Sequence, residues 1–267
     1  MKILKSCLAM LAIVSVFSAA AWAMKMNIDP ARAEISVKPG EEKTGVITVL
    51  NYDETGSARI KAYIQDLVYL PDGSNDFLAL GSTPWSLGGW IKIGPTEFDI
   101  PPGKQEAVRY IISVPKDAKG GRYGVIFFET IAPPSQAKEV GATVNVRLGA
   151  ILLVTVEGTK VVKAKITGMT TGEDKEKGFG ISWTVYNDSN ILVRPFGTIK
   201  IIDGAKKEIT AIDVNKEKSG VLPKTSRKFT VYYKDSAKLA KGEYYAQLVL
   251  DYGGEALLGG QSKFKIE

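Results

Sequence analysis

The sequence predicts an all-β protein made of two antiparallel β-sandwiches in tandem. Strand-like runs recur about every ten residues between turns rich in Gly, Pro, Asn and Asp, which is the spacing of sandwich domains. No amphipathic helix is recognisable after residue 23. The 267 residues are 45% apolar and 24% charged, and this composition supports two ordinary domains with cores of their own.

Most of the expected strands alternate apolar and polar residues, so that one face of each turns to a core. In the first half they are residues 45–51, 58–70, 107–114, 122–131 and 140–156. In the second half they are residues 180–187, 197–203, 228–233, 244–252 and 262–267. Between the two series, the domain boundary is expected near Glu157 and Gly158, where a new set of turns begins.

The two halves share a repeated pattern. Pro102 and Pro223 are 121 residues apart, and so are Tyr123 and Tyr244, each of which belongs to a Gly-x-Tyr that opens a hydrophobic strand. This indicates two copies of one sandwich plan. In immunoglobulin-like sandwiches a Tyr at this place forms a tyrosine corner. We therefore expect two immunoglobulin-like domains, in each of which the Tyr hydroxyl ties its strand to the preceding connection.

The first 23 residues have the pattern of a secretory signal peptide. Lys2 and Lys5 form a basic start, an apolar run follows over residues 7–17, and small residues precede Met24. Cleavage near Met24 would leave domains at 24–157 and 158–267, and an exported protein in the periplasm or at the cell surface. An uncleaved anchor is the alternative. No later run reaches 18 apolar residues, so no transmembrane segment is expected in the mature chain.

Several classes of chemistry are missing from the sequence. The chain has no histidine, and its one cysteine, Cys7, lies in the signal peptide. The usual catalytic triads and zinc sites are thereby removed, so we predict no enzyme, no cofactor and no metal site. A paired-carboxylate hydrolase remains a third hypothesis, because Asp and Glu are plentiful. The net charge of +6 falls to +4 without Lys2 and Lys5, and the charges are mixed, so no nucleic-acid partner is expected.

One apolar row is unusually long. From Val140 to Val156 every even-numbered residue is apolar, over about three times the length of an ordinary strand. The front half, 140–148, is expected to be an edge strand, and the back half, 149–156, to lead into the second domain after a bend at Gly149 and Ala150. Only Arg147 and Glu157 add charge at odd positions, and so weakly protected an edge indicates a pairing partner. The alternative is an ordinary edge strand over its own core.

The first domain resembles the PapD-like periplasmic pilus chaperones, which are immunoglobulin-like sandwich proteins. The likeness is carried by IDPARAEIS from Ile28, VITVLNYDETGSARIKAYIQD from Val46, GPTEFDIPPGKQEAVRYIISVPKD from Gly94 and GRYGVIFFETIAPP from Gly121. The second domain matches only in general plan. The long apolar row follows IAPP directly, at the place of the strand that this family lends to its subunits.

The resemblance implies a non-enzymatic chaperone or assembly factor. It would bind a pilin-like, β-rich subunit of a surface fibre by β-strand addition along its long edge strand. The partner-binding residues would be Val144, Val146 and Leu148 on one face of that strand, with Arg147 on the other.

The resemblance also implies a clamp for the terminal carboxylate of the subunit. The family uses an Arg early in the first strand, which Arg32 matches, and a guanidinium there would hold a carboxylate bidentately. It also uses a Lys on the last strand, but Leu153 stands at that position. This departure counts against the usual capture chemistry.

A rival hypothesis is a cell-envelope structural or adhesive module that binds a wall polymer or a surface protein. Trp85 and Trp90, in the stretch TPWSLGGW, would stack on sugars in that case. The alternative for both tryptophans is that they cover the end of a sandwich.

Overall fold

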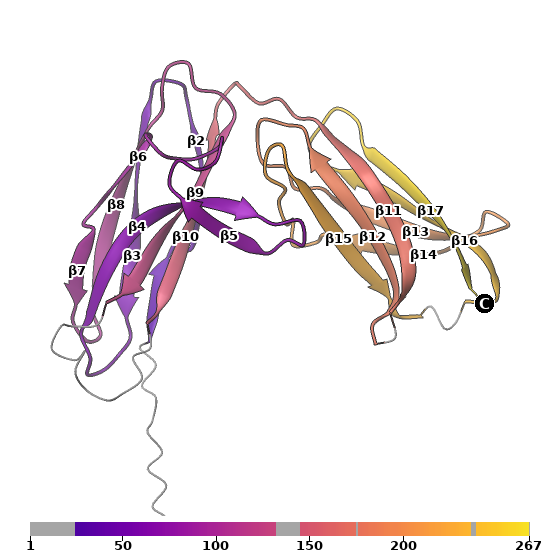
Figure 1. Ribbon diagram of the computed structural model, residues 1–267, viewed down its shortest axis with the longest axis horizontal. Coiled ribbons are helices and arrows are strands. Elements are labelled where there is room, and N and C mark those ends of the chain that lie inside the picture. Colours follow the sequence, from indigo (N-terminus) through magenta and orange to yellow (C-terminus); the bar gives the residue numbers. More distant parts are fainter. Residues whose placement is uncertain (1–24, 132–144, 175, 236–238, 267) are drawn as a thin grey trace, which may run out of the picture.

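The computed structural model describes residues 25–131, 145–174, 176–235 and 239–266. The predicted signal peptide and Val144 lie outside these residues, so both stay predictions. The described parts consist of strands and their connections (Figure 1). They contain no helix that is long and apolar enough to cross a membrane.

The first sandwich is formed by two sheets that face each other. One sheet has the strand order β1 (Met26–Asp29), β3 (Glu42–Asn51), β8 (Gln105–Ser113) and β6 (Ile91–Gly94). The other has the order β2 (Arg32–Val37), β10 (Arg147–Val156), β9 (Gly121–Thr130), β4 (Ala58–Tyr69) and β5 (Asn75–Ala79), and β7 (Glu97–Ile100) also pairs with β4. All pairs are antiparallel except β2 with β10, which are parallel. The sheets are thus antiparallel, as predicted, apart from this one parallel pair.

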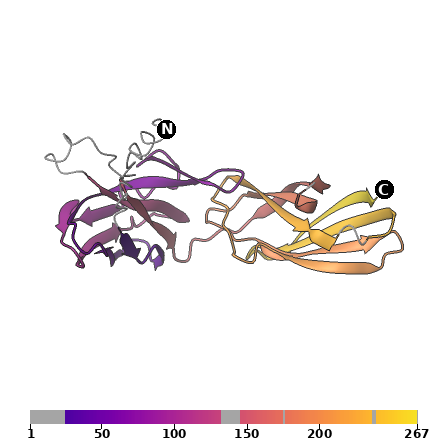
Figure 2. The ribbon, with the colours of Figure 1, turned by 90° about the horizontal axis from the view of Figure 1, so that it is seen from below.

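The second sandwich has the same two-layer plan. One sheet has the order β11 (Ala164–Asp174), β12 (Gly178–Asn187) and β15 (Ser226–Tyr233). The other has the order β14 (Glu208–Val214), β13 (Phe196–Asp203), β16 (Gly242–Asp251) and β17 (Leu258–Ile266). Figure 2 shows the two sandwiches one after the other along the molecule. The predicted fold, two immunoglobulin-like sandwiches in tandem, is confirmed.

Each sandwich has its own core because its strands alternate as the sequence predicts. In β12, for example, Phe179, Ile181, Trp183 and Val185 are buried, and the residues between them are half-buried on the outer face. They pack in one cluster with residues of β13 and β16. The first core is built in the same way from both of its sheets. Burial of apolar side chains between two sheets is the main force that stabilises each domain.

A third cluster of buried residues, here named the inter-domain cluster, lies where the two sandwiches meet. It contains Leu67, Tyr69, Tyr123, Val125, Phe127 and Leu153 of the first domain together with Leu222 of the second. The hairpin β4–β5 extends from the first domain to this junction (Figure 1). At its tip the carbonyl of Pro71 accepts a hydrogen bond of 2.7 Å from the N–H of Lys228 in β15. The domains are thus joined by packed side chains as well as by the chain.

Candidate functional site

The strand β10 is paired along its whole length on one edge but only partly on the other. Residues Arg147 to Thr155 pair with β9 without a register shift. On the opposite edge β2 pairs only with Ile151 to Val156, and the first bond there runs from the N–H of Ile151 to the carbonyl of Ala31, at 3.0 Å. Among the described residues, nothing pairs with that edge from Arg147 to Ala150, which we name the open edge.

Backbone groups of the open edge point away from the sheet. The N–H of Thr130 donates to the carbonyl of Val146 at 2.9 Å, so these two residues form a hydrogen-bonded pair. Hydrogen-bonded and non-bonded pairs alternate along an antiparallel ladder. The N–H and C=O groups of Arg147 and Gly149 are therefore directed outward, as the bond from Ile151 to β2 also indicates.

The apolar row of β10 faces the first core. Ala150, Leu152, Val154 and Val156 are buried there, and Leu148 is half-buried and packs against the same cluster. Val146 is also half-buried, at the start of the strand. The row thus becomes less buried toward the open edge.

The predicted bend at Gly149 and Ala150 is not seen in the strand pairing, since the register with β9 is continuous there. Gly149 has a different role. A Cβ atom on it would lie 2.8 Å from Val125 and 2.9 Å from Phe127, so glycine lets these side chains of β9 fold across β10. What changes directly after Gly149 and Ala150 is the other edge of β10, because β2 begins to pair with it at Ile151.

Arg147 lies on the face opposite Leu148, as predicted. Its guanidinium carbon is 3.7 Å from the centre of the Phe127 ring, and the rings of Tyr63 and Phe77 lie at 5.5 and 5.9 Å. It also donates a hydrogen bond to the side-chain carbonyl of Gln65. These contacts form an aromatic cage, which we define as Tyr63, Phe77 and Phe127.

Arg32 is exposed at the first position of β2, opposite Ile151. Its side chain makes no hydrogen bond or ion pair within the described residues. Its side chain is on the same face of β2 as Glu34 and Ser36, because residues two apart in a strand share a face. The structure thus places Arg32 beside the end of the open edge, together with Val146, Arg147 and Leu148.

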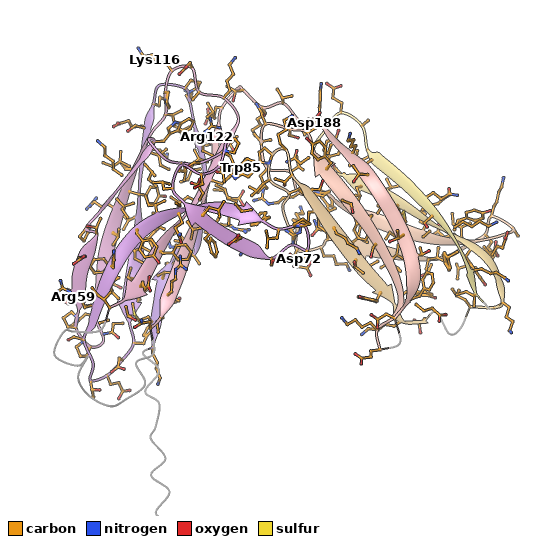
Figure 3. The ribbon with its side chains drawn as sticks, viewed as in Figure 1. Arg59, Asp72, Trp85, Lys116, Arg122 and Asp188 are labelled. Atoms are coloured by element: carbon orange, nitrogen blue, oxygen red, sulfur yellow. The ribbon has the colours of Figure 1, made fainter. Side chains whose placement is uncertain are left out.

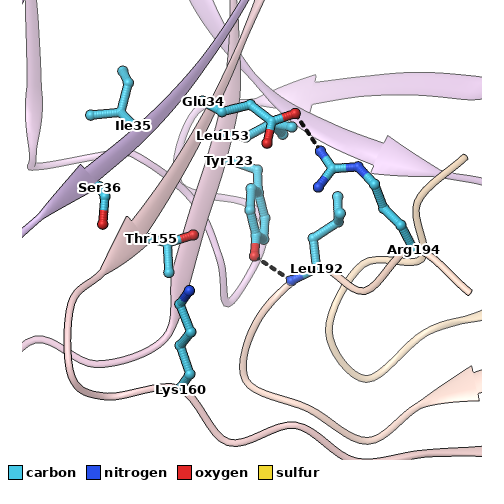
Figure 4. Close-up of a pocket in the computed structure, with 9 residues that line it drawn as sticks. All are labelled: Glu34, Ile35, Ser36, Tyr123, Leu153, Thr155, Lys160, Leu192 and Arg194. Carbon is cyan, nitrogen blue, oxygen red and sulfur yellow. Dashed lines mark hydrogen bonds and ion pairs between the residues drawn. The ribbon is translucent and has the colours of Figure 1, made fainter. Parts of the chain in front are cut away.

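A cavity of about 180 Å³ lies between the two domains, beside Glu34 of β2 (Figure 4). Arg194 of the second domain forms an ion pair of 2.6 Å with Glu34 across it. Lys160, from the connection between the domains, is exposed and points toward the same space. The residues that line the cavity are Glu34, Ile35, Ser36, Tyr123, Leu153, Thr155, Lys160, Leu192 and Arg194.

The position of Leu153 explains why it is not basic. Its side chain is only 5% exposed and belongs to the inter-domain cluster, where a charged ammonium would lose its hydration. The cations of this cleft are instead Lys160 and Arg194, which the sequence reasoning missed. One signal was available, since Arg194 is the only charged residue in the stretch ILVRPF from Ile191.

Tyr123 does not form the expected tyrosine corner within its own domain. Its hydroxyl accepts a hydrogen bond of 2.6 Å from the N–H of Leu192 in the second domain. Burial raises the pKa of the Tyr123 hydroxyl far above its usual value. In the second domain the expectation is confirmed, because the hydroxyl of Tyr244 donates to the carbonyl of Ala240 at 2.8 Å.

Both tryptophans of the TPWSLGGW stretch are half-buried. The indole N–H of Trp85 donates to the carbonyl of Leu67 at 3.1 Å, and its ring packs on the inter-domain cluster. Trp90 packs on the first core and its ring lies 4.8 Å from the guanidinium carbon of Arg122. Both tryptophans thus pack on clusters of buried residues, which favours the alternative interpretation.

Comparisons with known proteins find similarity only at the level of structure. No family model and no curated protein matches the sequence. The solved structure of the class 5 fimbrial chaperone CfaA has a TM-score of 0.49 and 16% identity, and covers 89% of this chain and 98% of its own.

Two solved complexes give similar values. The chaperone–tip adhesin complex of CFA/I fimbriae has a TM-score of 0.48, with 15% identity over 90% of this chain and 98% of its own. The CsuC–CsuE chaperone–tip adhesion subunit complex from Csu pili of Acinetobacter baumannii has a TM-score of 0.47, with 13% identity over 88% of this chain and 97% of its own. These three solved structures are of fimbrial or pilus chaperones or of their complexes, and this chain is similar to them in structure at low sequence identity.

Proposed function

We propose that this protein is an exported, non-enzymatic chaperone or assembly factor that binds a pilin-like subunit by β-strand addition to β10. The observation that carries the proposal is the open edge. Arg147 to Ala150 are paired with β9 on one side and with no described strand on the other. Unpaired N–H and C=O groups on an ordered strand are a template for a partner strand.

The side chains next to the open edge suit an apolar partner. Val146 and Leu148 are half-buried at the end of the first core, and Val144 would extend the same row. A subunit with an incomplete core would cover these side chains, while its backbone pairs with Arg147 and Gly149. Main-chain bonds would then supply the attachment, and the apolar row would supply the selectivity.

Arg32 supports one direction for the added strand. A strand on the open edge would lie in line with β2, because both occupy the same edge of β10. If it ran parallel to β10, its carboxyl end would approach Arg32, whereas an antiparallel strand would bring its amino end there. An exposed guanidinium without a described partner favours the carboxylate. Parallel addition with the chain end near Arg32 is therefore part of the proposal.

Crosslinking in cells tests the proposal. The tagged protein is crosslinked in the periplasm, and the proteins that are purified with it are identified for the wild type and for Val146→Asp and Arg32→Ala. We expect a small β-rich exported subunit with the wild type, and at least a tenfold lower yield with Val146→Asp, since a buried carboxylate opposes strand addition.

Matched controls are available on the far sheet of the first domain. Val46 is 40% exposed on β3, and Arg109 is exposed on β8. Val46→Asp and Arg109→Ala introduce the same chemical changes away from β10, and both should retain the subunit. If Val146→Asp recovers as much subunit as the wild type, or if the wild type recovers only wall polymer, the proposed function is contradicted and the envelope module is favoured.

A further inference from the structure

We infer that Arg147 is a positioning residue, whose side chain holds the front of β10 on the sheet and so keeps the open edge extended. That Arg147 holds β10 on the sheet does not depend on the proposed function. That this helps to capture a partner rests on the proposed function. Arg147 is the first residue of β10 and the first of the open edge. A strand end that is paired on one side only is the part of a sheet that opens most readily.

The backbone alone holds this end weakly. Before Arg147, Val146 replaces one ordinary ladder bond with a side-chain bond, because its N–H donates to the hydroxyl of Thr130 at 2.9 Å. Four residues after Arg147, β2 begins to support the second edge at Ile151. Between these points, the ladder to β9 and the side chains of β10 have to keep the strand in place.

Arg147 connects this end of β10 to three other strands. Its guanidinium lies over Phe127 of β9, and Tyr63 of β4 and Phe77 of β5 complete the aromatic cage. The rings support one another, since Phe77 meets Phe127 edge-on at 4.8 Å. The hydrogen bond from Arg147 to Gln65 fixes the plane of the guanidinium. A single side chain thus fastens β10 across the outer face of the sheet.

The neighbouring carboxylate does not compete for Arg147. Glu129 is directly opposite Arg147 in the register of β9 and β10, yet it accepts a hydrogen bond of 2.6 Å from the hydroxyl of Tyr63. Burial, followed by this bond to Glu129, raises the pKa of the Tyr63 hydroxyl. The guanidinium therefore stays on the rings.

This placement separates Arg147 from the surface that meets a partner. Its side chain points to the face opposite Leu148, so the partner would meet its backbone and not its guanidinium. A lysine cannot replace it fully, because stacking on Phe127 needs a flat cation and a fixed donor to Gln65. Arg147→Lys should accordingly restore only part of the effect of Arg147→Ala.

Amide hydrogen exchange of the protein without a partner tests the inference. In Arg147→Ala we expect the exchange protection of Val146, Leu148 and Ala150 to fall by about three- to thirty-fold, the range of a cation–π contact. Leu152 and Val156, further along β10, should be unchanged. The control is Arg122→Ala, which removes a similar contact, with Trp90, from the same sheet. Unchanged protection at the three front amides, or an equal loss along the whole strand, overturns the inference.

Capture in cells separates this inference from the proposed function. If Val146→Asp loses the subunit and Arg147→Ala binds it several-fold less, both stand. If Arg147→Ala frays the front amides but captures the subunit fully, the positioning role in capture is wrong while the proposed function stands. If Val146→Asp captures the subunit normally, the proposed function fails whatever the exchange rates show.

Discussion

The hydroxyl of Tyr123 in the first sandwich accepts a hydrogen bond of 2.6 Å from the backbone N–H of Leu192 in the second. Tyr123 is 1% exposed and packs in the inter-domain cluster with Leu153 and Leu222. The corresponding tyrosine of the second sandwich, Tyr244, bonds within its own domain. One repeated Gly-x-Tyr pattern thus fastens one domain internally and joins the two domains to each other.

Replacing Tyr123 tests how much this joint stabilises the protein. Tyr123→Phe keeps the ring but leaves the N–H of Leu192 without its acceptor, so we expect the free energy of unfolding to fall by about 1–2 kcal/mol. Urea unfolding measures it. Tyr244→Phe is the matched control, because it breaks a bond of similar length inside the second domain. Only Tyr123→Phe should also broaden the distribution of domain orientations in small-angle scattering, and an unchanged distribution would contradict the assigned joint.

Alkaline pH should weaken the same joint. Burial raises the Tyr123 pKa above the value of about 10 for an unfolded chain. The folded state therefore binds the phenolic proton more tightly than the unfolded state, so its contribution to stability is complete below about pH 10 and is lost as the pH rises further. We expect urea unfolding at pH 8 and pH 11 to differ less for Tyr123→Phe than for the wild type. The exposed Tyr52 gives a control, Tyr52→Phe, which should behave like the wild type.

Asp66 is fully buried and organises the loop that carries Trp85. Its carboxylate accepts bonds from the N–H of Thr83 at 2.8 Å, the hydroxyl of Thr83 at 3.1 Å and the hydroxyl of Ser86. Asp66→Asn replaces one acceptor oxygen with a donor, so the loop donors lose partners, and we expect a cost of about 2–3 kcal/mol in the free energy of unfolding. Asp99→Asn, at an exposed ion pair, is the control. A cost for Asp66→Asn as small as that of the control would show that the loop is organised by other contacts.

The tip of the β4–β5 hairpin is held against the second domain by Arg227. This side chain is half-buried, lies 5.8 Å from the ring of Tyr69, and donates to the carbonyl of Gly220 at 2.9 Å. At the tip, beside Asp72 (Figure 3), Gly73 has a φ of +90°, and a Cβ on it would lie 2.5 Å from the guanidinium. Both sides of the contact can therefore be changed separately.

We expect Gly73→Ala and Arg227→Ala to release the hairpin tip without unfolding either sandwich. Gly73→Ala adds both backbone strain and a clash, and Arg227→Ala removes the group that the tip rests on. Small-angle scattering should then show a wider range of domain orientations for both variants. Lys224→Ala, which breaks an exposed pair with Asp188 inside the second domain, should leave the scattering curve unchanged. A curve like that of the wild type for Arg227→Ala would rule out the hairpin as an inter-domain contact.

The periodic features of the sequence predicted the fold, because burial within one strand depends on nearby residues alone. The alternation in β12 and the Gly-x-Tyr at Tyr244 gave the correct face and the correct bond. The role of Tyr123 could not be predicted in this way. Its partner, Leu192, is 69 residues away and reaches it only because the domains meet at one particular angle.

The neighbouring positions of β10 and β2 could be predicted from the sequence, but the side-chain contacts around them could not. The apolar row of β10 marks the last strand of the first sandwich, and β2 lies early in the same sandwich. These two strands are neighbours in the sheet. The aromatic cage around Arg147 depends on the register of three strands, and no local pattern in the sequence encodes that register. Lys160 and Arg194 enter the cleft from the connection and from the second domain, so their positions follow from domain packing.

The inter-domain cluster has a consequence for how the protein unfolds. Leu222 has no exposed surface, and several of its apolar neighbours, such as Leu67 and Tyr69, belong to the other sandwich. Separating the domains would expose this shared apolar surface to water, so each sandwich is less stable alone than in the pair. The two domains should therefore melt in a single cooperative transition, and cutting the chain at Glu157 and Gly158 should yield two halves that melt at lower temperatures than the whole.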